Sequence, residues 1–317
     1  MIIFLYGQDT FRSKEKLREL KNKFIREIDK SGLNLIELDG EKININDFNK
    51  AVSTQSFLSK RRMIVIRNIF LAKKAVHGDL LEFLKSKKPD KSGDENIIIF
   101  FEAEPDKRTA LFKYLNASKF KEEFKKLENN NLINWITKRV SEKGGKINGQ
   151  NADYLASKSD GNLWALASEI DKLIAQKKDE EIGKKEIEES PLAKIADNIF
   201  NLTDAIAKQD KKLALRSIDD NLEAGMNEMY LLSMIVRQFR IIVRVKTALL
   251  NGLADNQQIA KKLGFHPFVV QKAMPQVRLY NMEKLKKIYE KLLATDLLLK
   301  SSDLNKKAII ENMVVKI

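Results

Sequence analysis

Four short runs rich in apolar residues constrain the fold of this chain more than any other feature. They cover residues 2–6, 33–38, 63–66 and 97–101, and amphipathic stretches with helical spacing separate them. Apolar runs of this length between amphipathic helices are typical of a parallel sheet that helices cover on both faces. We therefore predict an open α/β domain at the start of the chain.

The strand pattern stops near residue 132, and the rest of the chain predicts helices alone. A stretch of almost entirely charged residues, 177–189, is followed by Pro191 and is typical of a domain boundary. The predicted fold class is thus α/β plus all-α. The predicted domains are an α/β domain at 1–128, a small helical domain at 129–188 and a larger helical domain at 189–317.

The charge balance indicates an anionic partner. Lys and Arg number 58 against 44 acidic residues among 317, a net charge of +14, and the basic excess lies in the first and third predicted domains. Such a surface attracts polyanions and releases their counterions, which favours nucleic acid, although an acidic membrane satisfies the same electrostatics.

Composition also excludes several classes of protein. The chain has no Cys, so disulfides and thiolate metal sites are excluded and a reducing compartment is indicated. The longest uninterrupted apolar run, 97–101, is far shorter than the roughly 20 residues that a membrane-spanning helix needs. The apolar N-terminus lacks the basic region of a signal peptide. We predict a cytoplasmic protein without a membrane segment.

The loop after the first apolar run stands where a phosphate-binding loop belongs. Counting from Gly7, such a loop needs a second Gly at position 12 and a Lys at position 13, but the sequence has Arg12 and Ser13. We therefore predict no ATP hydrolysis by this chain. The loop is interpreted as a turn in which Asp9 or Thr10 caps the following helix.

No other group of residues predicts a catalytic site. Glu102 and Glu104 follow the strongest apolar run and are interpreted as a solvated strand end. His77 and His266 are isolated, so both are interpreted as structural. We predict no catalytic residue, no metal and no cofactor.

The segment from 53 to 62 is a candidate for protein recognition. Phe57 and Leu58 are adjacent large apolar residues in an otherwise polar segment, next to Ser56. Neighbouring residues at a helix end point about 100° apart, so at least one of the two tends to face outward. The pair is either an exposed anchor for a partner's apolar pocket or a cap on the domain core.

Two further sets of side chains are noted in the helical part. Arg237, Arg240 and Arg244 share one helix face, which is either a stripe that faces phosphates or subunits or a face that is solvated or paired with acids. Trp135 and Trp164 fall in apolar patterns and are predicted to lie in the core.

These segments together resemble a known family, the delta subunit of the bacterial DNA polymerase III clamp loader. The resemblance covers nearly the whole chain and rests on the order and spacing of residues 4–11, 55–59, 62–68, 237–240, 259–264, 267–268 and 296–300. It implies an ATPase-like (AAA+) fold that has lost its nucleotide site, followed by a helical lid and a helical collar that mediates oligomerisation.

The resemblance also implies function and partners. The family binds one protomer of the beta sliding clamp and helps to hold a clamp interface open, without catalysis of its own. Phe57, Leu58 and the adjacent Ser56 match its clamp-binding motif, in the order aromatic then aliphatic. The other implied partners are the gamma/tau and delta prime loader subunits and primed DNA within the complex.

Two alternatives from other classes stay open at this point. One is an active ATPase with an irregular phosphate loop. The other is a basic helical protein that binds nucleic acid and has no clamp partner.

Overall fold

The computed structural model describes residues 1–54, 61–86, 96–159, 161–177 and 180–317. The chain divides into two compact units, Met1–Lys126 and Leu127–Ile317. We call them the sheet unit and the helical unit. The boundary predicted between residues 188 and 189 lies inside the helical unit and stays a prediction.

The sheet unit contains a five-stranded sheet in the order β2-β3-β4-β1-β5. Every neighbouring pair is parallel, so the predicted α/β class is confirmed. The strands are β1 (Ile2–Tyr6), β2 (Leu35–Asp39), β3 (Met63–Arg67), β4 (Ile97–Glu102) and β5 (Phe120–Glu123). The helical segments are α1 (Thr10–Glu27), α2 (Ile45–Ser53), the short 3-10 helix η1 (Ile69–Leu71), α3 (Lys74–Ser86) and α4 (Ala110–Asn116).

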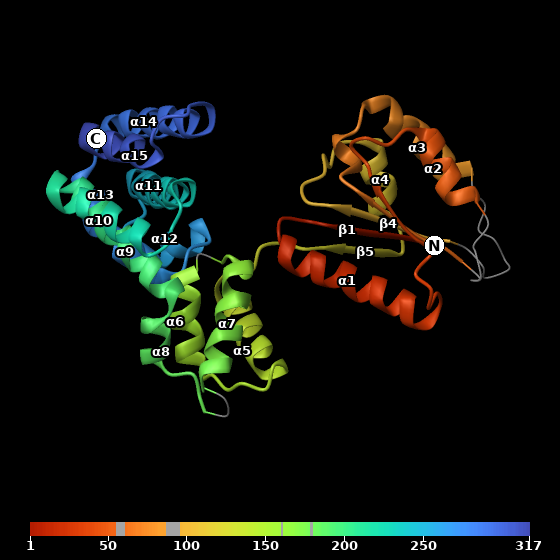
Figure 1. Cartoon of the computed structure of the whole chain (residues 1–317), viewed down its shortest axis with the longest axis horizontal. Helices are drawn as coiled ribbons and strands as arrows, with labels where there is room; N and C mark the ends of the chain where they lie inside the picture. Colours follow the sequence, from red (N-terminus) through yellow and green to blue (C-terminus); the bar gives the residue numbers. More distant parts are fainter. Residues whose placement is uncertain (55–60, 87–95, 160, 178–179) are drawn as a thin grey trace. The chain divides into compact units, whose positions relative to one another are not determined.

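Helices cover both faces of this sheet, α1 on one side and α2, α3 and α4 on the other (Figure 1). The alternation of side chains along β1 divides the core accordingly. Ile3 and Leu5 pack with Leu17 and Phe24 of α1. Phe4, in contrast, belongs to the core cluster formed with α2, α3 and α4. This explains why the central strands are apolar without a polar alternation.

The fifth strand was not predicted from the sequence. β5 has the sequence Phe-Lys-Glu-Glu, and its first three side chains are exposed because it is an edge strand. Its pairing with β1 rests on backbone hydrogen bonds, with Phe120 opposite Ile3 and Glu123 opposite Tyr6. A polar edge strand carries no apolar pattern, so periodicity could not reveal it.

The helical unit begins with four helices that pack around a small core. They are α5 (Asn129–Glu142), α6 (Gly149–Ser159), α7 (Leu163–Lys177) and α8 (Lys184–Glu189). Ile136, Leu155 and Leu166 are fully buried at the centre of these helices. The prediction that Trp164 is core is wrong, because this residue is 49% exposed.

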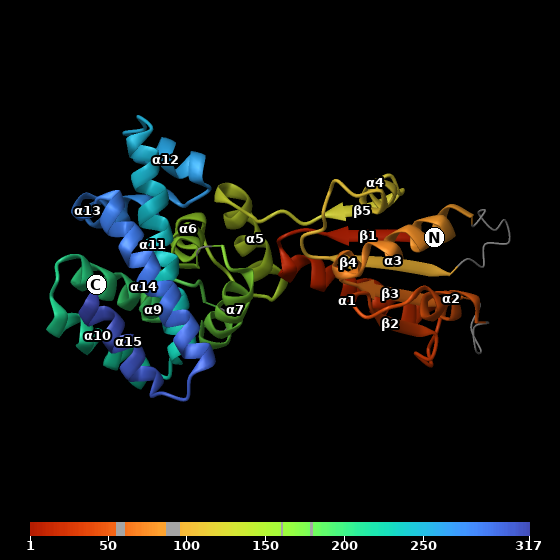
Figure 2. The same cartoon turned by 90° about the horizontal axis from the view of Figure 1, so that it is seen from above.

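Seven helices follow directly, in agreement with the helical pattern predicted for this part of the chain. They are α9 (Pro191–Ala207), α10 (Lys211–Glu223), α11 (Glu228–Leu250), α12 (Asn256–Leu263), α13 (Pro267–Leu279), α14 (Met282–Ser301) and α15 (Lys306–Lys316). The long helix α11 packs against α9, α12, α13, α14 and α15 (Figure 2). Its buried Leu231, Ile235, Phe239 and Ile242 form the centre of one continuous core.

Among the helices of residues 1–54, 61–86, 96–159, 161–177 and 180–317, none is long and apolar enough to cross a membrane. Within the same ranges, acidic and histidine side chains nowhere gather in a group of three that could hold a metal ion.

Candidate functional site

The apolar pair singled out in the sequence, Phe57 and Leu58, lies outside the described residues, and so does Ser56. The structure describes the two ends of the segment that carries them. Helix α2 ends at Ser53, and residues 61 and 62 lead into β3.

The two ends of that segment are tied to each other. The Arg62 guanidinium donates to the Ala51 carbonyl at 3.1 Å, and the Arg62 backbone N–H donates to Asn96 Oδ1 at 2.9 Å. The Asn96 amide in turn donates to the Val52 carbonyl at 2.9 Å. Ala51 and Val52 are themselves buried against the sheet. These three bonds form a polar staple that fixes where the segment leaves and re-enters the domain.

The loop after β1 is closed against β5. Gly7 adopts φ +136°, and a Cβ atom there would lie 2.3 Å from the Phe124 carbonyl oxygen. The Asp9 N–H donates to that same carbonyl at 2.9 Å. Only glycine fits this backbone conformation and this close approach.

The N-terminus of α1 holds a carboxylate from its own chain. Asp9 is buried and accepts from the Arg12 backbone N–H at 3.0 Å, so the predicted cap is confirmed. The Arg12 guanidinium bonds the other Asp9 oxygen at 3.1 Å and the Lys125 carbonyl at 3.3 Å. A phosphate at this position would meet a negative charge where a phosphate-binding loop offers bare N–H groups.

The side chain of Glu102, at the end of β4, is buried. It was expected to be solvated, but it is 4% exposed, and its Oε1 accepts from the Ile69 N–H at 2.7 Å. Burial raises the pKa of its carboxyl to about 7, although backbone bonds from Ile69 and Phe70 oppose this rise. No sequence pattern signalled this, because the burial comes from the 69–71 turn folding over the strand end.

The two histidines have structural partners. His77 Nε2 lies 2.8 Å from the Ile69 carbonyl oxygen of the same turn. His266 caps α13, with Nδ1 accepting from the Phe268 N–H at 3.2 Å and Nε2 2.7 Å from Asp153 Oδ1. These contacts agree with a structural role for both residues, and their lack of a catalytic role stays a prediction.

The three arginines of α11 have different surroundings. Arg244 donates to the Leu263 carbonyl at 2.7 Å and lies over the Phe265 ring at 4.5 Å. Arg240 hydrogen-bonds the Tyr289 side chain. Arg237 lines a hollow between helices. Their contact with DNA or with other subunits stays a prediction.

Comparison with known proteins adds sequence matches that span most of the chain. Residues 4–124 match the family model described as DNA polymerase III, delta subunit. Residues 196–317 match the model described as DNA polymerase III delta subunit, C-terminal domain.

Individual proteins agree with these matches. The chain is 25% identical over 331 aligned residues to the DNA polymerase III subunit delta of Bacillus subtilis (strain 168), covering 99% of this chain and 91% of that protein. It is 22% identical over 256 residues to the "Probable DNA polymerase III subunit delta" of Aquifex aeolicus (strain VF5), covering 74% of this chain and 67% of that protein.

A solved structure shares the fold. It is that of the Bacillus subtilis DNA clamp loader delta protein, with a TM-score of 0.60 and 24% sequence identity. The match covers 99% of this chain and 94% of that one.

Proposed function

The chain belongs to the DNA polymerase III delta subunit family, and from that premise we propose that it is the clamp-opening subunit of a bacterial clamp loader. It binds the beta sliding clamp through Phe57 and Leu58, with Ser56 beside them, and holds one interface of the ring open. It acts in the cytoplasm during DNA replication and does not hydrolyse ATP.

The observation that carries the proposal is the match of both family models, which leaves only residues 1–3 and 125–195 unmatched. The polar staple around Arg62 and Asn96 supports the assigned contact. Because the staple fixes Ala51, Val52 and Arg62, which flank the segment, these residues lose little conformational freedom when a partner binds.

The closed first loop supports an action without ATP. Asp9 caps the helix that would otherwise receive a phosphate, and Arg12 is bonded to Asp9. Ser13, which stands where the loop lysine would be, is buried. The rival hypothesis, an ATPase with an irregular loop, requires all three side chains to rearrange.

This subunit can favour ring opening without hydrolysing ATP if it binds the open ring more tightly than the closed ring. A contact shifts the equilibrium between closed and open ring only by the difference between its affinities for the two states. The clamp contact of this chain must therefore be tighter for the open ring. The ATP-dependent steps fall to the gamma/tau subunits.

Residues 189–317 are proposed to mediate assembly with the gamma/tau and delta prime subunits. Helix α14 carries Leu293, Leu297 and Leu298 on an exposed face, with exposed fractions of 63%, 58% and 45%. Large exposed apolar side chains gathered on one helix face are typical of a protein interface. We expect the chain to contact primed DNA only within the assembled complex.

The test is a pull-down of the full chain with the purified sliding clamp, paired with equilibrium dialysis against labelled ATP. We expect clamp capture and no ATP binding. Micromolar ATP binding by the chain alone would favour the ATPase. Tight, salt-sensitive DNA binding without clamp capture would favour the basic nucleic-acid-binding protein.

A further inference from the structure

Helix α6 belongs to the predicted small helical domain, yet polar contacts join it to helices that follow residue 189. The first contact involves His266, the N-cap of α13, whose Nδ1 accepts from the Phe268 N–H at 3.2 Å. Nε2 therefore carries the ring proton and donates to Asp153 Oδ1 of α6 at 2.7 Å. This bond fixes the start of α13 to α6.

The second contact lies further along α6, at Lys158, whose side chain is 5% exposed. Its ammonium group donates to Asp197 Oδ2 of α9 at 2.8 Å, and Lys272 of α13 also bonds Asp197. Burial alone would raise the pKa of the Asp197 carboxyl, but the bonds from the two lysines hold that pKa below its ordinary value. One charged carboxylate thus connects three helices.

Aromatic rings pack at the same contact between α6 and α13. Tyr154 of α6 meets Phe268 of α13 edge to face, with ring centres 6.5 Å apart. The Lys158 ammonium lies 5.2 Å from the centre of the Tyr154 ring and 5.9 Å from that of Phe268. Ring faces attract a cation, so they stabilise this ammonium group beside its acid.

A third contact starts from another helix, α7. Glu169 is buried and accepts hydrogen bonds from the Ser190 hydroxyl and the Leu192 N–H, at the beginning of α9. Ser190 is buried too, and it caps α9 by accepting from the Ala193 N–H at 3.2 Å. The junction between the two predicted helical domains is therefore bonded to α7 as well.

The positions of these contacts restrict motion. Asp153 and Lys158 lie about 7.5 Å apart along the axis of α6, at 1.5 Å per residue. Two such attachments leave only a rotation about the line that joins them, and the Glu169 contact on α7 opposes that rotation. We infer that the three contacts form a joint that locks residues 127–317 into one rigid arm. The boundary predicted between residues 188 and 189 is then not a hinge.

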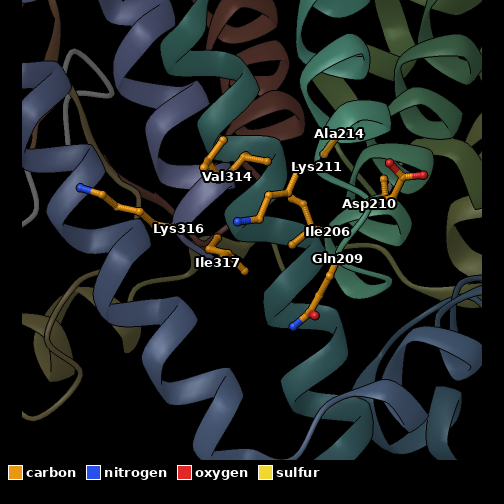
Figure 3. A pocket seen from close by; sticks show the side chains of 10 residues that line it. Ile206, Gln209, Asp210, Lys211, Ala214, Val314, Lys316 and Ile317 are labelled. Carbon is orange, nitrogen blue, oxygen red and sulfur yellow. The ribbon is translucent and has the colours of Figure 1, made fainter.

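A different feature of the helical unit supplies a control for this joint. A hollow of about 170 Å³ lies between the α9–α10 turn and α15 (Figure 3). All the residues that line it follow residue 204, so it does not attach α6 or α7 to the later helices. Lys211 lines it and is exposed, so Lys211→Met removes a lysine without touching the joint.

The consequence for clamp loading rests on the proposed function. If residues 189–317 assemble with the other loader subunits, a rigid arm passes their displacements on to residues 127–188. A hinge at 188 would absorb those displacements instead. A chain with a loosened joint should therefore still capture the clamp and still assemble, but it should lose clamp loading.

Distances between two spin labels test the joint in the full chain. The protein has no Cys, so Ser168→Cys in α7 and Lys286→Cys in α14 place labels at two exposed positions. Double electron–electron resonance should give one narrow distance distribution for this labelled parent and for Lys211→Met. Asp153→Ala combined with Lys158→Met removes both polar contacts of α6, so the distribution should broaden and a second population should appear.

A broad distribution in the labelled parent, or an equally narrow one in the double variant, would overturn the inference. If the double variant loses its folded circular-dichroism spectrum, Asp153→Ala and Lys158→Met are measured singly, since neither leaves a buried charge without a partner. Each should broaden the distribution, and broadening by neither would overturn the inference.

Loading assays complete the test. A double variant with a broadened distribution that loads clamps at the rate of the parent would overturn the consequence for loading. The distance measurement needs no clamp, so a failure of the parent to capture the clamp would overturn the proposed function alone.

Discussion

In the sheet unit, Arg12 and Lys107 each bond one acid, whereas in the helical unit two lysines from different helices share one acid, Asp197. Arg12 bonds Asp9 at 3.1 Å, and Lys107 bonds Glu123 at 2.7 Å. Asp197 accepts from Lys158 at 2.8 Å and also from Lys272. The difference shows that the basic residues of such a chain need not form one continuous surface that binds polyanions. The sheet unit uses its charges to close its own loops, and we propose that its apolar segment at residues 57 and 58 provides the recognition.

The largest effect is expected for Phe57→Ala combined with Leu58→Ala. Truncating an aromatic anchor in a desolvated pocket costs about 2–4 kcal/mol, or about 30- to 700-fold in affinity. We expect clamp binding and clamp loading to be lost, while assembly with the other subunits persists. A clamp pull-down and a loading assay measure this.

Leu71→Ala is the matched control, because it truncates a leucine of the same unit that is 66% exposed. It should bind the clamp normally. If the double variant loses its folded circular-dichroism spectrum, the pair belongs to the core. If the double variant folds and still binds the clamp, recognition lies elsewhere.

Gly7→Ala probes the closure of the first loop. The backbone strain and the overlap with the Phe124 carbonyl should lower the free energy of unfolding by about 3 kcal/mol. Gly78→Ala is the control, since nothing lies within 4 Å of a Cβ atom there and alanine favours the helix by up to about 1 kcal/mol. Urea unfolding compares them, and equal stabilities would show that the loop opens readily.

Glu102→Gln should change the pH dependence of stability. Because burial raises the pKa of Glu102 from 4.5 to about 7, the native state holds this proton more tightly than the unfolded state. Its contribution to stability is therefore full below pH 4.5 and lost as the pH rises through about 7, up to about 3 kcal/mol.

The glutamine resembles the protonated acid, so the variant should keep its stability where the wild type loses it. Urea unfolding well below and well above the pKa measures the difference. Glu104→Gln, at an exposed neighbouring site, should show the same pH dependence of stability as the wild type. If the free energy of unfolding of both variants changes with pH as that of the wild type does, ionisation of Glu102 does not destabilise the folded protein.

The smallest effect is expected when one helix cap in each unit is removed. Asp9→Ala and Ser190→Ala remove the caps of α1 and α9, which accept N–H groups at 3.0 and 3.2 Å. Each should lower the free energy of unfolding by about 1 kcal/mol. Asp9→Asn keeps an acceptor and should lose less. ATP binding by Asp9→Ala would show that the carboxylate alone closes the phosphate position.

Local patterns predicted the local features of this fold. The apolar runs gave β1, β3 and β4 to within a residue or two, and the Asp9 cap followed from its place before a helix. The burial of Glu102 could not be predicted, because it depends on a turn that starts at Ile69.

One candidate site is visible in the sequence, and the other is formed only by the packing of helices. Phe57 and Leu58 stand out in the sequence as an apolar pair, and they stay a prediction. The ion pairs of Asp197 with Lys158 and Lys272 could not be predicted, because the three residues lie on three helices and share no motif. Only the packing of the helical unit brings them together.

The strand order has a consequence for how the protein is made. Of the five strands, β1 is synthesised first, but its neighbours in the sheet are β4 and β5. An unpaired strand of Ile-Ile-Phe-Leu-Tyr must therefore wait until residues 97–123 have been synthesised. Exposed strands of this kind are prone to aggregate, and pairings distant in sequence form slowly. We expect the nascent sheet unit to depend on chaperones until its final strand emerges.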